Sequence, residues 1–209
     1  MIGTATTEIK PDRLFITLGV ETIDTTSTDA LNQNNKQMES TINAIKEIGI
    51  QESEFSTSQF NIYPKYDYDQ RIGDSILIGY KVTNTIQIDT EKTHLVSEII
   101  DVAVDAGANN FKQLSFGISP QVVADIQYDL ISEAALDAKR KGSKIAQSLG
   151  VDIIGVKYAS LYQDVPYQNP SVFYAEARSA TPIFSDNQEI IVSINVIFLT
   201  EKWPVNYQK

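Results

Sequence analysis

Hydrophobic and polar residues recur with two different periods along this chain, and the two periods predict two kinds of element. Apolar side chains spaced three or four positions apart predict helices at residues 29–48, 92–106 and 120–149. Alternation with period two, or an extended composition, predicts strands. The expected strands are residues 4–10, 14–21, 55–68, 76–88, 114–118, 154–162 and 189–199.

Each predicted helix is followed by a glycine, namely Gly49, Gly107 and Gly150. The position just after a helix often adopts a positive φ, where a Cβ would be strained, so glycine is favoured there. The order of elements favours an α+β fold: a mixed, mainly antiparallel sheet with the three helices packed on one face.

The third predicted helix is long, at roughly 43 Å for residues 120–149. Its middle carries the small residues Ala134, Ala138 and Gly142 on one stripe. Small side chains allow the backbone of a neighbour to approach closely, and this neighbour could be another subunit or another part of the chain.

The chain is expected to form one domain over residues 1–199, followed by a tail at 200–209. Residues 163–187 lie between two predicted strands and form an apolar, proline-containing loop insertion. Loops longer than about 15 residues are uncommon in compact domains and tend to be functional or disordered. We therefore treat this loop as a candidate contact surface.

Composition narrows the possible partners. The 209 residues carry a formal net charge of -10 with a pI near 4.5 and include no cysteine. An acidic surface repels phosphate backbones, so no nucleic-acid partner is expected, and no apolar run is long enough for a membrane span. The start of the chain, from Met1 to Thr4, has neither the basic nor the apolar region of a signal peptide. The protein is thus either cytoplasmic or an exported chain in which Met1 replaces a removed leader.

A series of short motifs, in order and spacing, resembles the SIMPL-domain family over residues 3–199. The motifs are Gly3-Thr4-Ala5, Lys10-Pro11-Asp12, Leu18-Gly19-Val20-Glu21, Ala30, Asn34-Asn35, Met38, Gly49-Ile50, Thr57, Pro64, Tyr66-Asp67-Tyr68, Gly79-Tyr80, Thr83-Asn84-Thr85, Asp105-Ala106-Gly107-Ala108-Asn109, residues 134–139, Ala146 and Gly150. The resemblance implies an α+β fold, export to the periplasm or cell surface, and a link to envelope or oxidative stress. It implies no catalytic motif.

The residues themselves indicate no catalytic centre or cofactor. His94, the single histidine, lies at a predicted helix start and is expected to be solvated. Asp67, Asp69 and Asp74 cluster near a predicted hairpin tip, but Arg71 stands where an EF-hand would need an oxygen ligand. No catalytic residue, cofactor or metal site is therefore predicted, and the protein is expected not to be an enzyme.

Aromatic and apolar residues in the hairpin and the loop are the candidate interaction surface, because tyrosine is enriched at protein interfaces. They are Tyr63, Tyr66, Tyr68, Tyr80, Val165, Tyr167, Phe173, Tyr174 and Phe184. Cross-strand packing of the tyrosines is the simpler alternative. A basic run at Lys139, Arg140, Lys141 and Lys144 is expected to be a solvated helix face, with pairing across a subunit contact as the alternative.

Three functions remain open at this point. The first is an exported, non-enzymatic envelope protein that self-assembles into a homo-oligomer as a binding or scaffold protein. The second is an adaptor or chaperone-like module that binds client proteins through the tyrosine-rich hairpin. The third is an enzyme of unrecognised type, which a deep pocket with two convergent carboxylates would support.

Overall fold

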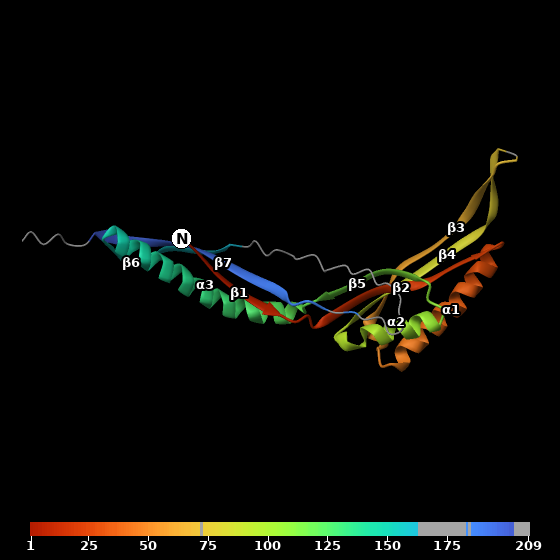
Figure 1. Cartoon of the computed structure of the whole chain (residues 1–209), viewed down its shortest axis with the longest axis horizontal. Helices are drawn as coiled ribbons and strands as arrows, with labels where there is room; N and C mark the ends of the chain where they lie inside the picture. The colour runs from red at the N-terminus through yellow and green to blue at the C-terminus, as the bar shows by residue number, and fades with distance from the viewer. Residues whose placement is uncertain (72, 163–182, 184, 203–209) are drawn as a thin grey trace, which may run out of the picture. The chain divides into compact units, whose positions relative to one another are not determined.

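The computed structural model describes residues 1–71, 73–162, 183 and 185–202 (Figure 1). In chain order its elements are β1 (Ile2–Ile9), β2 (Arg13–Asp24), α1 (Ser27–Glu47), the short 3-10 turn η1 (Glu52–Glu54), β3 (Phe55–Asp69), β4 (Asp74–Thr90), the 3-10 turn η2 (Thr93–Leu95), α2 (Val96–Asp105), β5 (Asn110–Gly117), α3 (Pro120–Leu149), β6 (Val151–Tyr162) and β7 (Gln188–Lys202). The α+β class, the three helices and the long third helix are confirmed.

The strands form two sheets instead of the single sheet expected from the sequence. One sheet has the order β1-β7-β6 and the other β3-β4-β2-β5, and neighbouring strands within each sheet are antiparallel. The difference arises because β1 pairs with β7, from the far end of the chain, with Ile2 opposite Asn195. Periodicity identifies a strand but carries no information about a partner so distant in sequence.

The two sheets belong to two compact units. The first unit contains the described residues 1–10, 118–162 and 186–202, and the second contains 11–71, 73–117, 183 and 185. The assignment of residues 1–199 to one domain stays a prediction. The tail was expected to start at residue 200, but β7 continues to Lys202.

In the second unit, α1 and α2 pack against each other and against one face of the four-stranded sheet (Figure 1). The core is formed by the alternating apolar residues of β2 and β4 and by the apolar stripes of the helices. Its fully buried members include Leu14, Ile16, Leu18, Ile45, Ile88 and Ile99. Thr26 caps α1 by accepting a hydrogen bond from the backbone N–H of Asp29, which satisfies one of the unpaired donors at the helix start.

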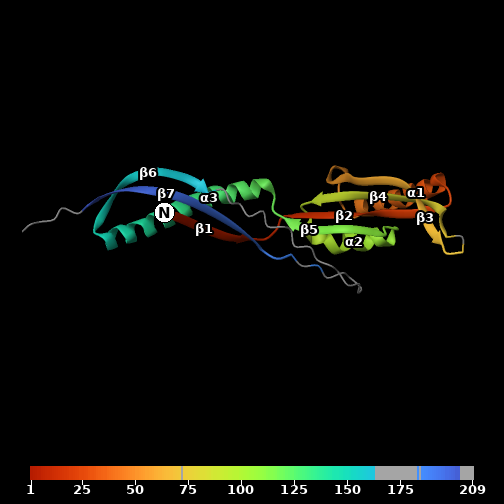
Figure 2. The same cartoon turned by 90° about the horizontal axis from the view of Figure 1, so that it is seen from above.

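In the first unit, α3 covers one face of the β1-β7-β6 sheet (Figure 2). The helix contributes Leu130, Ala134 and Ala138 to this core, and β7 contributes Ile190, Val192, Ile194 and Val196. The small middle of α3 therefore faces its own sheet. The close neighbour that the small residues admit is β1 of the same unit, so this stripe is not free to bind a second copy.

The predicted helix ends are confirmed. Gly49, Gly107 and Gly150 all have positive φ, at 99°, 111° and 65°. Gly150 takes the left-handed conformation directly after α3 and donates its N–H to the last turn of the helix. This conformation ends α3 and lets β6 start at the next residue.

Candidate functional site

The β3–β4 hairpin extends beyond the rest of its sheet. The last pair between β2 and β4 joins Asp24 and Tyr80, whereas β4 begins six residues earlier, at Asp74. We refer to the described residues of this extension, 65–71 and 73–78, as the hairpin arm (Figure 1). Gly79 lies where the arm leaves the sheet, and a Cβ at this position would overlap the carbonyl oxygen of Asp24.

A β-bulge separates the arm from the sheet. Lys65 is opposite Gly79 but Tyr66 is opposite Leu77, so Ile78 is an extra residue in β4. A bulge bends its strand. Because it adds one residue, the side chains beyond it lie on the opposite face from the one that uninterrupted alternation would give them. Uninterrupted alternation along residues 76–88 predicts that Ile76, Ile78 and Tyr80 share one face, and this prediction is wrong for Ile76, which faces away from Tyr80.

The bulge gives the arm two different faces. Register places Tyr66, Tyr68 and Leu77 on one face and Asp67 and Ile76 on the other. The aromatic side chains are well exposed, with Tyr66 at 58% and Tyr68 at 62%. A two-stranded ribbon is at best marginally stable alone in water, and grouped exposed apolar side chains mark contact sites. Because Tyr66 and Tyr68 are this exposed, cross-strand packing does not bury their side chains.

Two further predicted tyrosines lie closer to the sheet and already have neighbours. The ammonium group of Lys81 lies 5.9 Å from the ring centre of Tyr63 and 2.6 Å from a carboxylate oxygen of Glu21. The hydrogen bond to Glu21 raises the pKa of Lys81 and keeps this cation in place. Tyr80 is half-buried. The predicted tyrosine surface is thus divided, and only Tyr66 and Tyr68 belong to the arm.

The remaining candidates lie elsewhere. Val165, Tyr167, Phe173, Tyr174 and Phe184 are outside the described residues. Ile76, Leu77 and Ile78 are also exposed, although they are not among the predicted contact residues. Three consecutive apolar residues in a strand could have shown this, because side chains alternate between faces and all three cannot point into one core.

The carboxylates at the arm mostly satisfy local donors. Asp69 binds the side chain of Arg71 at 3.0 Å and also accepts its backbone N–H, which stabilises the turn. Asp67 and Asp74 each accept the backbone N–H of the following residue. Within the described residues, no three histidine or acidic side chains come together in a way that could hold a metal ion.

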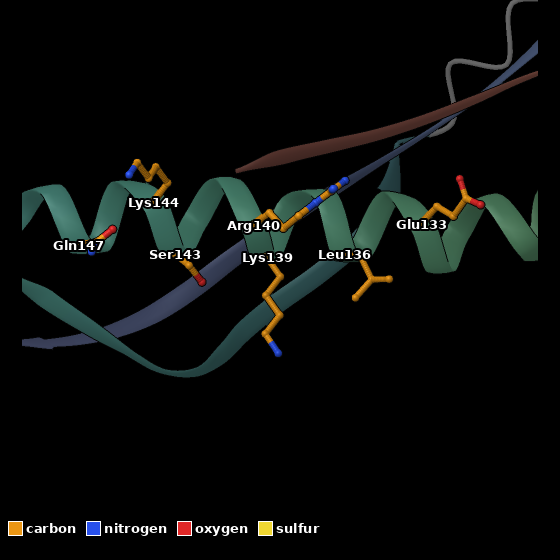
Figure 3. Close-up of a pocket in the computed structure, with 7 residues that line it drawn as sticks. All are labelled: Glu133, Leu136, Lys139, Arg140, Ser143, Lys144 and Gln147. Atoms are coloured by element: carbon orange, nitrogen blue, oxygen red, sulfur yellow. The ribbon is translucent and has the colours of Figure 1, made fainter.

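A second surface feature is an open groove of about 860 Å³ along α3 (Figure 3). Its lining, which we refer to as the α3 groove, is Glu133, Leu136, Lys139, Arg140, Ser143, Lys144 and Gln147. Figure 3 shows Leu136, Lys139 and Ser143 leaving the helix on one side, while Glu133 and Lys144 leave it on the other. The groove has no pair of convergent carboxylates of the kind that acid–base hydrolysis needs.

The basic run of the sequence divides in two at this groove. Lys141 lies outside the lining and binds Asp137 at 2.6 Å, while Arg140 is 3.7 Å from the same carboxylate. Hydrogen bonds from Lys141 and from the backbone N–H of Thr4 lower the pKa of Asp137. Asp137 therefore joins α3 to β1, whereas Lys139 and Lys144 are left exposed in the groove.

His94 lies in the short turn η2, and its side chain is exposed, as expected. No helix within the described part of the chain combines the length and apolar character needed to cross a membrane.

Within the described residues, two antiparallel sheets and three helices define an α+β protein, and its most prominent exposed features are the hairpin arm and the α3 groove. A family model for SIMPL, described as a protein of unknown function (DUF541), matches residues 1–198. The chain belongs to the SIMPL family, as the motif series indicated.

Several named relatives support this membership. The 26 kDa periplasmic immunogenic protein of Brucella melitensis biotype 1 is 25% identical over 199 residues, which cover 90% of this chain and 78% of that protein. The uncharacterised protein YggE of Escherichia coli K12 is 25% identical over 182 residues, covering 87% of this chain and 72% of that protein. YggE of Edwardsiella ictaluri is 26% identical over 181 residues, covering 85% and 74%.

Proposed function

We propose that this protein is an extracytoplasmic, non-enzymatic SIMPL protein that self-assembles, and that the hairpin arm is its main contact surface. The observation that carries the proposal is the exposure of Tyr66, Tyr68, Ile76, Leu77 and Ile78 on a ribbon of only two strands. Burying these side chains against a partner would remove apolar surface from water, at about 25 cal/mol for each Å².

The extracytoplasmic location is supported by the relatives, one of which is named a periplasmic protein. The absence of cysteine is compatible with an oxidising compartment, where stray thiols are a liability. The role in envelope or oxidative stress rests on the family resemblance alone. Assembly at the envelope is compatible with a scaffold function in such a stress response.

A second copy is favoured over an unrelated client because the described residues include both an arm and strand edges that have no partner strand among them. Strand β3 forms one edge of its sheet and β6 one edge of the other. An exposed strand edge is a template for pairing with another chain. The alternative, an adaptor that binds client proteins through the same arm, is favoured by the two exposed tyrosines, since tyrosine is common in recognition surfaces.

The proposal is tested by light scattering on a sizing column, with protein at tens of micromolar. We expect a mass well above that of one chain. The double variant Tyr66→Ser and Tyr68→Ser should shift the mass downwards without lowering the melting temperature, because both side chains are exposed. Tyr128→Ser is the matched control, since Tyr128 is 72% exposed but lies on α3.

A strict monomer in the unsubstituted protein would contradict self-assembly. The adaptor function is favoured instead if the protein is a monomer that binds an unfolded client protein and the double variant loses this binding.

A further inference from the structure

Strand β3 has an open edge along the hairpin arm. Within the described residues it pairs with β4 alone. The N–H of Tyr68 is bonded to the carboxylate of Asp67 at 2.9 Å, and the N–H of Ser75, the residue opposite Tyr68 in β4, is likewise bonded to a side chain. In an antiparallel ladder, every second residue turns its N–H and C=O away from the partner strand. Tyr68, Tyr66 and Pro64 therefore face the open edge, where the missing N–H of proline is tolerated.

Two side chains of opposite charge flank Tyr66 in this strand. Lys65 and Asp67 are both exposed, and neither is in an ion pair among the described residues. Successive side chains of a strand point to opposite faces, so Lys65 and Asp67 share one face and Tyr66 lies on the other. A half-turn of the strand about Tyr66 exchanges the positions of the lysine and the aspartate. This stretch is therefore complementary in charge to a second copy of itself.

The charges select one register for such a pair. When two copies of β3 run antiparallel with Tyr66 opposite Tyr66, Lys65 of each copy lies opposite Asp67 of the other. Residues directly opposite each other share a face, with their Cβ atoms about 4.5–5.5 Å apart, so each lysine meets an aspartate. A shift of two residues sets Lys65 opposite Lys65 in one direction and Asp67 opposite Asp67 in the other, and like charges there are unfavourable.

The same register joins apolar side chains and backbone groups. Pro64 of each copy lies opposite Tyr68 of the other, and Tyr66 and Tyr68 are 58% and 62% exposed in a single copy. The N–H of Tyr66 reaches the C=O of Tyr66 in the second copy. Once Asp67 turns to Lys65 of the second copy, the N–H of Tyr68 is released to the C=O of Pro64 there. Because Pro64 has no N–H, the C=O of Tyr68 is left to water.

The other open edges among the described residues suit a second copy less well. At the edge of β1, the N–H of Thr4 is already bonded to Asp137 of α3. Strand β6 has a register irregularity on each side of Val156, which is 56% exposed, and bulges turn an edge away from pairing. Strand β5 has a single charged side chain, Lys112, and residues 73–78 of the arm contain no cation. Only the edge of β3 combines both charges with a regular stretch.

We propose that two copies of this chain pair through the β3 edges of their hairpin arms, antiparallel, with Tyr66 opposite Tyr66 and Lys65 of each copy bound to Asp67 of the other. The inference rests on the self-assembly proposed above and names the contact that produces it. Because both copies use the same surface, the contact is isologous and closes as a two-fold pair. Light scattering should therefore give the mass of an even number of chains.

Charge reversal tests this contact. Lys65→Asp sets two carboxylates opposite each other, and Asp67→Lys sets two ammonium groups opposite each other. Each variant is expected to raise the dissociation constant of the pair by roughly tenfold or more, because like charges across an interface are costly. The controls Lys36→Asp on α1 and Asp101→Lys on α2 make the same charge changes at exposed positions and should leave the constant unchanged.

Mixing the two variants tests the register. Opposite charges face each other again between unlike copies, so a mixed pair should form from two samples that fail separately. The charge-swapped chain Lys65→Asp/Asp67→Lys should assemble as the unsubstituted protein does. Circular dichroism checks that each variant is folded, and Lys65→Gln or Asp67→Asn replaces a reversal that is not.

Introduced cysteines give a readout that does not depend on charge, because the chain has no cysteine of its own. Lys65→Cys mixed with Asp67→Cys and oxidised should form a covalent dimer. Cα atoms directly opposite each other in an antiparallel pair are about 4.5–5.5 Å apart, within the range of about 4.4–6.8 Å for a disulfide. Neither variant should form a covalent dimer alone, because like positions are offset along the strands. Tyr128→Cys, exposed on α3, is the control partner for each.

The outcomes are separable. Assembly that resists both reversals, is not restored by mixing, contains an odd number of chains or gives no covalent dimer with the cysteine pair overturns this inference and leaves self-assembly in place. A monomeric unsubstituted protein overturns both. If the reversals weaken binding of an unfolded client protein but leave the mass of the assembly unchanged, the edge of β3 belongs to a client and the inference is overturned.

Discussion

Gly3 of β1 lies directly against Ala134 of α3, so closely that a Cβ on Gly3 would overlap the carbonyl oxygen of Ala134. The same Cβ would stand 2.7 Å from the Cβ of Ala138. Further along the helix, a Cβ on Gly142 would be 2.6 Å from the ring of Phe198 in β7. The small residues of α3 thus allow the helix to rest on its own sheet at short range, and this contact holds the first unit together.

Gly3→Ala is therefore expected to destabilise the first unit by about 1–3 kcal/mol, because a buried backbone contact must widen to admit the methyl group. Chemical denaturation followed by circular dichroism measures the change. Gly155→Ala is the matched control in the same sheet, because its Cβ would meet only a side-chain carbon of Leu199 at 3.7 Å. Equal stability of the two variants would show that β1 and α3 are not in close contact.

At Gly150, a substitution is expected to lower stability through backbone strain alone, because an added Cβ would not clash with any neighbour. Its φ is 65°, and a Cβ there would have no heavy atom within 4 Å. Gly150→Ala should cost about 1–2 kcal/mol of unfolding free energy, since a left-handed residue with a Cβ is strained. Gly150→Asn should cost less, because asparagine tolerates this conformation better. A denaturation series that ranks the two variants in the opposite order would contradict this account.

A buried amide connects α1 to two strands. Nδ2 of Asn34 donates to the carbonyl oxygen of Val20 in β2 at 3.0 Å and to that of Val82 in β4 at 3.4 Å. Asn34→Ala should lower the unfolding free energy of the second unit by about 1–3 kcal/mol, because it removes the donor from two buried carbonyl groups. Asn35→Ala, at the exposed neighbouring position, should change it little. Thermal unfolding of both variants makes the comparison.

Local features of the fold could be predicted from the sequence, and distant pairings could not. The glycine after each helix and the start of α3 at Pro120 depend on backbone preferences of a few residues, so they are visible in the sequence. The division into two sheets depends on Ile2 pairing with Asn195, and no periodic pattern encodes that contact. A single sheet was expected because periodicity identifies a strand but not the strand with which it pairs.

The candidate surfaces show the same division. Tyr66 and Tyr68 could be identified as contact residues by type, but the bulge at Ile78 determines which neighbours share their face. The basic run was visible, yet its sequence did not show that Lys141 binds Asp137 while Lys139 stays in the groove. Leu136 and Val156 were missed because an apolar residue on an amphipathic element gives no sign that its side chain is uncovered.

Acid should weaken the second unit through Glu54. Burial, the largest single influence, raises the pKa of Glu54, but hydrogen bonds from Thr90, the backbone of Gln51 and Lys92 together outweigh it, and the net pKa is lowered from 4.5. The carboxylate accepts the N–H of Gln51 at 2.6 Å and the ammonium of Lys92 at 3.2 Å.

A carboxyl group whose pKa is lower in the folded state stabilises the fold above its unfolded pKa and loses this contribution as the pH falls through the folded pKa. Stability measured by urea denaturation should therefore decline below pH 4.5, the ordinary value for Glu54. Glu54→Gln should be less stable at neutral pH and should show a shallower decline on acidification, whereas the exposed control Glu39→Gln should follow the unsubstituted protein. If Glu54→Gln keeps the full slope, the acid sensitivity has another source and the ion pair with Lys92 does not contribute to it.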